Sequence, residues 1–211
     1  MAIDDRGERQ LSIAVFGCGY VGMTTALTFC ELEHDVVCVD ADKHKIELLQ
    51  KGQIPFFEPG MKEMLNRHLQ EGNIRFTQEA EEAIKASKII YIAVGTPSDD
   101  DGSTDLSFVE DVARTIGRYQ GADILAVIKS TVPVGTAEKV ERWIRESQRH
   151  PYQVDVVSNP EFLREGNALY DALHPDRIII GAQSKKAAKI VHQLYAGLDA
   201  PSIMPTEKWL I

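Results

Sequence analysis

A group of glycines near the amino end of the chain has the spacing that a dinucleotide requires. Gly17, Gly19 and Gly22 follow an apolar run at residues 13–16 and precede a helical stretch. In this pattern the first glycine permits a tight turn, the second lets the backbone approach a pyrophosphate, and the third lets the helix lie close to the strand. The helix then directs free N–H groups and its positive dipole end at the phosphates. The pattern predicts a dinucleotide site; the alternative is a structural turn that binds nothing.

An acidic residue, Asp40, ends the next apolar run. It lies near the spacing of about 20 residues at which a carboxylate holds the hydroxyls of the adenosine ribose. Ala41 and Asp42 follow it, so no arginine stands there to receive a 2′-phosphate. The pattern therefore favours NAD over NADP.

Three further polar segments follow apolar runs and could reach the same ligand, because ligands of open parallel sheets bind beyond the carboxyl ends of the strands. They are Gly-Thr-Pro at residues 95–97, a hydroxyl-rich stretch at 129–136, and a segment at 159–166 that contains Glu161 and Glu165. If this last segment is helical from its proline, the two carboxylates share one helix face. Taken singly, each segment is better explained by helix capping or a solvated first turn. Together on one edge they favour a site.

Alternating apolar and amphipathic stretches must position these groups. Such alternation predicts βαβ units and a parallel sheet covered on both faces. We predict an α/β fold: one doubly wound, Rossmann-type domain over residues 11–206, with a mainly parallel sheet of six or more strands. Residues 11–16 should lie near its middle, beside residues 35–39. The expected strands are 11–16, 35–39, 74–77, 88–94, 124–129, 154–157 and 177–180, and the expected helices are 21–33, 43–51, 61–70, 79–86, 105–119, 136–148 and 185–196.

Composition narrows the class of protein. Lys and Arg number 23 against 32 Asp and Glu, a formal charge of −9, which disfavours nucleic acid as a partner. No apolar run approaches the roughly 18 residues that span a bilayer, and residues 1–10 are polar, so we expect a disordered tail, no membrane partner and a cytoplasmic protein.

Cys18, Cys30 and Cys38 are expected to be buried apolar thiols, and no metal site is expected. His68 is expected on the polar face of its helix.

With these motifs in this order, the chain resembles the UDP-glucose/GDP-mannose dehydrogenase family, and within it the members that oxidise UDP-glucose. The match extends from residue 11 to about residue 206, and the segment at 159–166 is far more specific than the glycines. The resemblance is carried by residues 17–22, Asp40 with Lys45, and residues 55–60, 95–97, 129–133, 159–166 and 175–177.

Members of this family oxidise the C6 alcohol of a nucleotide sugar to a carboxylate with two NAD⁺. The resemblance thus implies NAD as cofactor, UDP-glucose as substrate, UDP-glucuronate as product and a homodimeric parent protein. It implies that Thr131 and Glu161 act near the reacting carbon through an ordered water, and that the backbone of Phe162, Leu163 and Arg164 contacts the sugar. The residues that it places at the NAD site are Gly17, Gly19, Tyr20, Val21, Gly22, Asp40, Lys45, Thr96, Ser130 and Glu165.

The family's nucleophilic cysteine and its catalytic lysine and asparagine lie beyond the point where this chain ends. The three cysteines at hand cannot substitute, because they fall inside the βαβ unit for the adenine half of the cofactor. We therefore expect an amino-terminal NAD domain, with residues 207–211 beginning a connection, that binds NAD and turns over no nucleotide sugar alone. The alternatives are a non-catalytic NAD-sensing or regulatory module, or the same domain from a GDP-mannose or UDP-N-acetylhexosamine dehydrogenase.

Overall fold

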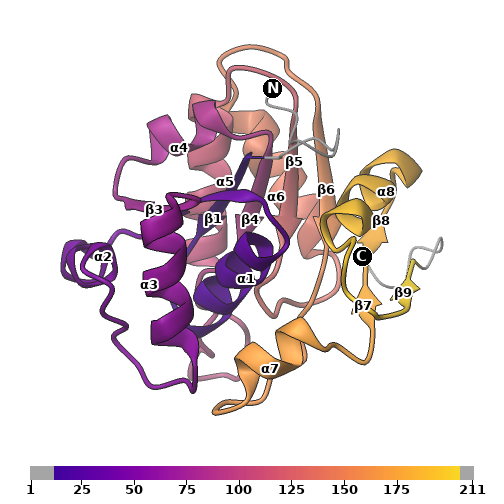
Figure 1. Ribbon diagram of the computed structural model, residues 1–211. Helices are drawn as coiled ribbons and strands as arrows, with labels where there is room; N and C mark the ends of the chain where they lie inside the picture. Colours follow the sequence, from indigo (N-terminus) through magenta and orange to yellow (C-terminus); the bar gives the residue numbers. More distant parts are fainter. Residues whose placement is uncertain (1–11, 205–211) are drawn as a thin grey trace.

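The computed structural model describes residues 12–204 and contains a seven-stranded sheet with helices on both faces (Figure 1). The strand order is β3-β2-β1-β4-β5-β6-β8, parallel except for β8, which runs antiparallel to β6. The order reverses between β1 and β4, the place where ligands of such sheets bind. The strands are β1 (Ser12–Phe16), β2 (Asp35–Val39), β3 (Ile74–Thr77), β4 (Ile89–Ile92), β5 (Ile124–Ile128), β6 (Val154–Ser158) and β8 (Gly181–Ala182).

Two buried clusters lie on opposite faces of the sheet, because successive side chains of a strand point to opposite sides. In β1, Ile13 and Val15 belong to the first cluster and Ala14 and Phe16 to the second. The helices that contribute to the first cluster are α1 (Tyr20–Glu31), α2 (Lys43–Gln50), α3 (Met61–Glu71), α7 (Ala168–Leu173) and α8 (Lys185–Leu194); those of the second are α4 (Ala80–Ala86), α5 (Ser107–Tyr119) and α6 (Thr136–Ser147). Figure 1 shows α1 and α3 in front of the sheet and α5 and α6 behind it.

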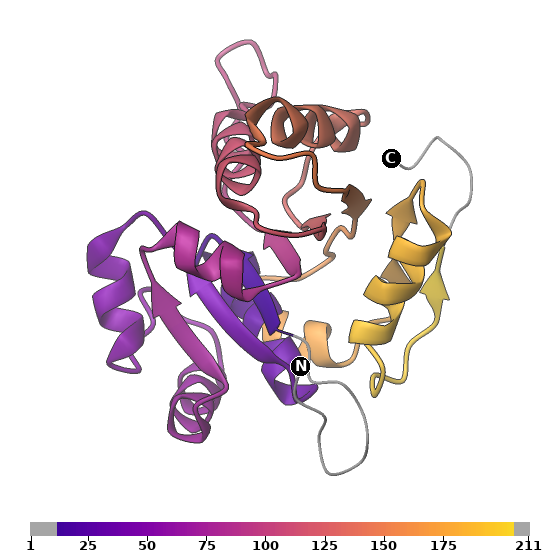
Figure 2. The same ribbon diagram turned by 90° about the horizontal axis from the view of Figure 1, so that it is seen from above.

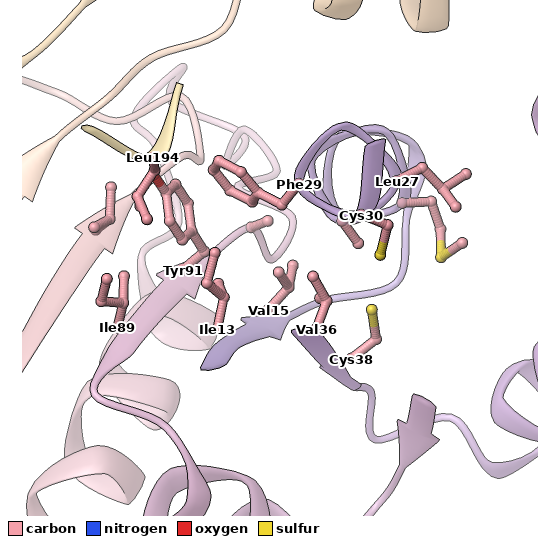
Figure 3. Close-up of a cluster of buried hydrophobic side chains, with 14 of the residues drawn as sticks. Ile13, Val15, Leu27, Phe29, Cys30, Val36, Cys38, Ile89, Tyr91 and Leu194 are labelled. Carbon is pink, nitrogen blue, oxygen red and sulfur yellow. The ribbon is translucent and has the colours of Figure 1, made fainter. Parts of the chain in front are cut away.

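Helix α1 is the most deeply enclosed helix of the first cluster, with a continuous buried stretch from Gly22 to Cys30. Its Phe29 packs against Tyr91 of β4, with ring centroids 4.9 Å apart, and close to Leu194 of α8 (Figure 3). The buried Thr28 hydroxyl donates to the carbonyl of Thr24 at 2.8 Å, so its burial leaves no orphaned polar group. Packing on several sides holds α1 in place, and with it the glycines that precede it.

The predicted architecture is confirmed: the sheet is mainly parallel, and β1 lies in its interior between β2 and β4. The expected strand at residues 177–180 is wrong in detail. It is interrupted, so that β7 (Ile178–Ile179) pairs with β9 (Ser202–Ile203) in a separate two-stranded sheet while β8 joins the main one. Figure 2 shows strands β7, β8 and β9 together with α8 beside the rest of the molecule. The predicted tail at 1–10 and connection at 207–211 lie outside the described residues.

His68 is also placed differently from the prediction. It is 3 % exposed, with Nε2 2.6 Å from a carboxylate oxygen of Glu31 and Nδ1 3.0 Å from one of Glu71. A polar side chain can be buried when such partners satisfy it.

Among residues 12–204, no helix is long and apolar enough to cross a membrane.

Candidate functional site

The glycine turn, residues 17–22, connects β1 to α1, and its three glycines meet different surroundings. Gly17 has φ +97°, and a Cβ there would lie 2.5 Å from the carbonyl oxygen of Ala93. A Cβ on Gly22 would lie 1.8 Å from the carbonyl oxygen of Gly17, whereas one on Gly19 would meet nothing within 4 Å. Gly17 and Gly22 therefore serve close packing, and Gly19 leaves open space in front of the helix.

That open space lies at the start of α1, where Gly19 is the N-cap residue and supplies no side-chain cap. The first N–H groups of an α-helix have no partner within the helix and attract anions. The first turn of α1 contains no acidic residue that would compete for them. The arrangement fits a pyrophosphate at the glycine turn.

Asp40 follows β2 and brings the expected groups together. Its Oδ2 accepts hydrogen bonds from the backbone N–H of Cys18 and from Nζ of Lys45, both at 2.8 Å, and its Oδ1 accepts from the N–H of Asp42 at 3.0 Å. Burial raises the pKa of the Asp40 carboxyl, but these hydrogen bonds outweigh it and the net pKa is lowered. Asp40 is thus an ionised carboxylate beside the glycine turn, suited to accept hydrogen bonds from ribose hydroxyls and unfavourable to a 2′-phosphate.

Thr96, Ser130 and Thr131 follow β4 and β5 and join the two strand ends to each other. The hydroxyl of Thr96 donates to the carbonyl of Thr131 at 2.8 Å. The hydroxyl of Ser130, buried at 7 % exposure, donates to the carbonyl of Val94 at 2.6 Å. The Ser130 side chain therefore ties the end of β5 to the residues that end and follow β4, while Thr131 is exposed at this edge.

The 159–167 segment follows β6 and is irregular, so the conditional prediction of a helix from Pro160 is wrong. The carboxylate of Glu161 accepts a hydrogen bond from the N–H of Leu163 at 2.6 Å, and Gly166 has φ +81°. A side chain that captures a nearby backbone N–H competes with helix formation. The helix, α7, begins only at Ala168, so the two carboxylates of this segment do not share a helix face.

Arg164 and Phe162 of the same segment are engaged by neighbouring residues. The guanidinium of Arg164 donates to both carboxylate oxygens of Asp171 on α7, at 2.9 and 2.6 Å. The ring of Phe162 is exposed, with the guanidinium of Arg177 5.4 Å from its centroid. The guanidinium and the backbone N–H of Arg164 are thus both engaged by Asp171.

A cavity of about 510 Å³ opens beside the 159–167 segment, and its lining includes Lys129, Asn159 and Glu161 together with threonines of α1. Lys129 is the first residue of the hydroxyl-rich stretch at residues 129–136, and the sequence predicts no role for it. Its Nζ lies 3.5 Å from the carbonyl oxygen of Pro160, and burial lowers the pKa of its ammonium to about 8, against the opposing effect of the Glu161 charge. A lysine directly after a wholly apolar strand was the signal that could have identified it.

Tyr20 and Glu58 form a contact that the sequence did not predict. The Tyr20 hydroxyl donates to the Glu58 carboxylate, and the ring packs on Phe56 with centroids 5.4 Å apart. The Tyr20 side chain is therefore directed toward residues 56–58, and it is the residue's backbone that lies at the glycine turn.

The cysteines are free and buried, as predicted. Burial raises the pKa of the Cys30 thiol, and a hydrogen bond with Cys18 together with burial raises that of Cys38. Thiols of this kind are poor nucleophiles. Within residues 12–204 no group of three or more His, Cys, Asp or Glu side chains is arranged to hold a metal ion.

The fold and the site define a dinucleotide-binding domain, and comparison with known proteins gives its family. The profile of the UDP-glucose/GDP-mannose dehydrogenase family, NAD binding domain, matches residues 11–199. The UDP-glucose 6-dehydrogenase TuaD of Bacillus subtilis is 44 % identical over 191 residues, which are 90 % of this chain and 41 % of TuaD. The chain belongs to this family and is an NAD-binding domain.

Solved structures agree with this assignment. A UDP-glucose dehydrogenase from the hyperthermophilic archaeon Pyrobaculum islandicum has a TM-score of 0.93 and 43 % identity, covering 98 % of this chain and 49 % of the other. A ternary complex of GDP-mannose dehydrogenase from Pseudomonas aeruginosa has a TM-score of 0.88 and 35 % identity, covering 93 % and 46 %. The chain thus spans about half the length of these relatives.

Proposed function

We propose that the protein containing this domain oxidises the C6 hydroxyl of UDP-glucose to the carboxylate of UDP-glucuronate. Two hydrides pass to two NAD⁺ and one water supplies the second carboxylate oxygen. The single observation that carries the proposal is that Thr131, Glu161 and the glycine turn follow strands of one parallel sheet, at its carboxyl edge. The relatives named as UDP-glucose dehydrogenases support this substrate. We also propose a homodimeric parent protein in the reducing cytoplasm, in keeping with the free thiols.

NAD⁺, when bound, accepts the hydride, and residues of this chain would hold the NAD⁺. The backbone of the glycine turn, including Tyr20 and Val21, would face the pyrophosphate, with Gly19 giving access. Asp40 and Lys45 would contact the adenosine ribose, an assignment supported by the ionised state of Asp40. The residues proposed for the NAD site are Gly17, Gly19, Tyr20, Val21, Gly22, Asp40, Lys45, Thr96, Ser130 and Glu165.

The 159–167 segment would contact the sugar through the backbone of Phe162, Leu163 and Arg164. Thr131 and the carboxylate of Glu161 would orient a water, and Glu161 would accept its proton as the acid is released. The N–H of Leu163, 2.6 Å from the Glu161 carboxylate, supports this role because it orients the carboxylate. Holding the water and the reacting C6 carbon in the right relative geometry can lower the barrier of their reaction by about 7–11 kcal/mol.

Two measurements test the proposal. Titration calorimetry on the 211-residue chain should show NAD⁺ binding and much weaker NADP⁺ binding; equal affinities would contradict the role of Asp40. NADH formation by the parent protein should be greatest with UDP-glucose when it is compared with GDP-mannose and UDP-N-acetylhexosamines. A greater rate with another sugar would reassign the substrate, and NAD binding without turnover of any nucleotide sugar would favour a sensing module.

A further inference from the structure

Glu58 is a buried carboxylate in the chain between α2 and α3, with 5 % of its surface exposed. It accepts hydrogen bonds from three donors: the Tyr20 hydroxyl, the N–H of Gly166 at 2.9 Å and the N–H of Leu169 at 3.2 Å. Burying a carboxylate is costly unless hydrogen bonds replace its water. These three donors are uncharged, so the burial of the Glu58 carboxylate is favourable only while all three stay within hydrogen-bonding distance of it.

The donors come from the two regions that meet at the proposed site. Tyr20 is the first residue of α1 and belongs to the glycine turn, whereas Gly166 and Leu169 lie at the end of the 159–167 segment and the start of α7. The Tyr20 hydroxyl also accepts from the N–H of Gly166 at 2.6 Å, which closes a triangle of hydrogen bonds around Glu58. Burial and the hydrogen bond to Glu58 raise the pKa of Tyr20 to about 12, so its hydroxyl remains a donor at neutral pH.

The 159–167 segment needs such anchors because it has no regular secondary structure of its own. Gly166 is fixed by Glu58 and Tyr20, and Arg164 by Asp171. Anything that fixes the start of α1 also fixes the Tyr20 ring, and through it the position of Gly166.

We propose that Glu58 is a positioning residue that couples the glycine turn to the 159–167 segment, so that NAD bound at the turn orders the segment that carries Glu161 and Glu165. The inference rests on the proposed function, because it takes NAD at the turn and the sugar at the segment. Glu58 touches neither ligand and acts through Tyr20, Gly166 and Leu169. Because coupling is reciprocal, a ligand at the segment strengthens NAD binding by the same factor.

Hydrogen exchange on the 211-residue chain, with and without saturating NAD⁺, tests this coupling. The readout is the exchange of residues 166–173, which are not among the proposed NAD contacts. NAD⁺ should slow their exchange about fivefold or more in the wild-type chain, the lower range of measured couplings. In Glu58→Gln this slowing should be lost while the glycine turn stays protected by NAD⁺. Tyr20→Phe should lose it as well, because it removes the hydroxyl that binds Glu58 and Gly166 and keeps the Tyr20 backbone that is proposed to contact NAD⁺.

Two matched variants serve as controls: Glu63→Gln, an exposed acid-to-amide change on α3, and Tyr152→Phe, which lies before β6. Both should retain the wild-type response. Slowing of residues 166–173 that persists in Tyr20→Phe and Glu58→Gln would overturn the proposal, as would its absence from the wild-type chain when the turn is protected. If Glu58→Gln does not fold, as judged by circular dichroism, Tyr20→Phe decides. Absence of NAD⁺ binding to the wild-type chain would overturn the proposed function itself.

Discussion

The glycine turn and the 159–167 segment meet at one edge of the sheet, yet different forces hold them. The turn is set by backbone packing, with Gly17 and Gly22 in contact with neighbouring main chain, and by one carboxylate, Asp40. The segment is irregular and is held by side chains of distant residues, among them Glu58. A turn built from close backbone contacts tolerates no added side chain at Gly17 or Gly22, whereas a segment fixed by a few side chains can be released by a single substitution that removes one of them.

The largest expected effects come from valine at two glycines of the turn. Gly22→Val should lower the free energy of unfolding by about 3 kcal/mol or more, because the added Cβ would lie 1.8 Å from the Gly17 carbonyl oxygen. Gly19→Val should fold like the wild type, since its Cβ meets nothing within 4 Å, but should lose NAD⁺ binding. Urea denaturation and titration calorimetry measure the two effects. NAD⁺ affinity retained in Gly19→Val would mean that the turn has only a structural role.

The carboxylate beside the turn should matter next. Asp40→Asn should weaken NAD⁺ binding about tenfold or more, the range for a hydrogen bond to a charged group, and should narrow the preference for NAD⁺ over NADP⁺. Calorimetry with both cofactors measures this, with Asp155→Asn, an exposed site on β6, as the matched control. An unchanged preference would place the adenosine ribose elsewhere.

Lys129, the buried cation beside the 159–167 segment, should affect stability through its pKa, because burial disfavours its charged form whereas hydrogen bonds favour the charged form of Asp40. The pKa of Lys129 is lowered to about 8 by burial, so between that pH and the usual lysine value the unfolded chain binds more protons than the folded one. The stability of the wild type relative to Lys129→Met should therefore rise with pH over this interval. Urea denaturation of both proteins from neutral to alkaline pH measures the difference. Parallel curves would show that Lys129 is solvated.

The smallest effect is expected at the ion pair between Arg164 and Asp171. The hydrogen bonds from Arg164 lower the pKa of Asp171 to about 2, so the pair's contribution is full above the pKa of a free aspartate and is lost as the pH falls toward 2. Because the Arg164 side chain is 72 % exposed and solvent screens its charge, Asp171→Asn should remove at most about 1 kcal/mol of this pH-dependent stability. Acid denaturation followed by circular dichroism measures it; an equal acid response in both proteins would contradict the prediction.

Much of the fold could be predicted because it depends on local patterns. Strands such as β4 are apolar throughout, as strands covered on both faces must be, and the glycine spacing placed the turn between β1 and α1. The segment after β6 could not be predicted in the same way. Its residues satisfy a helical spacing of carboxylates, but Glu161 binds the N–H of Leu163 instead.

The sequence alone determined the alternation of strands and helices, the dinucleotide turn and the acid that follows β2, because each depends on residues near in the chain and on the steric needs of glycine. Tertiary structure decided where Glu58 and His68 lie. The helical pattern placed His68 on a polar face and gave no position for Glu58, and both are buried because partners from other elements satisfy them. Gly166 meets Tyr20 across the fold, and a contact between residues so far apart in the chain exists only once the sheet has brought α1 and α7 together.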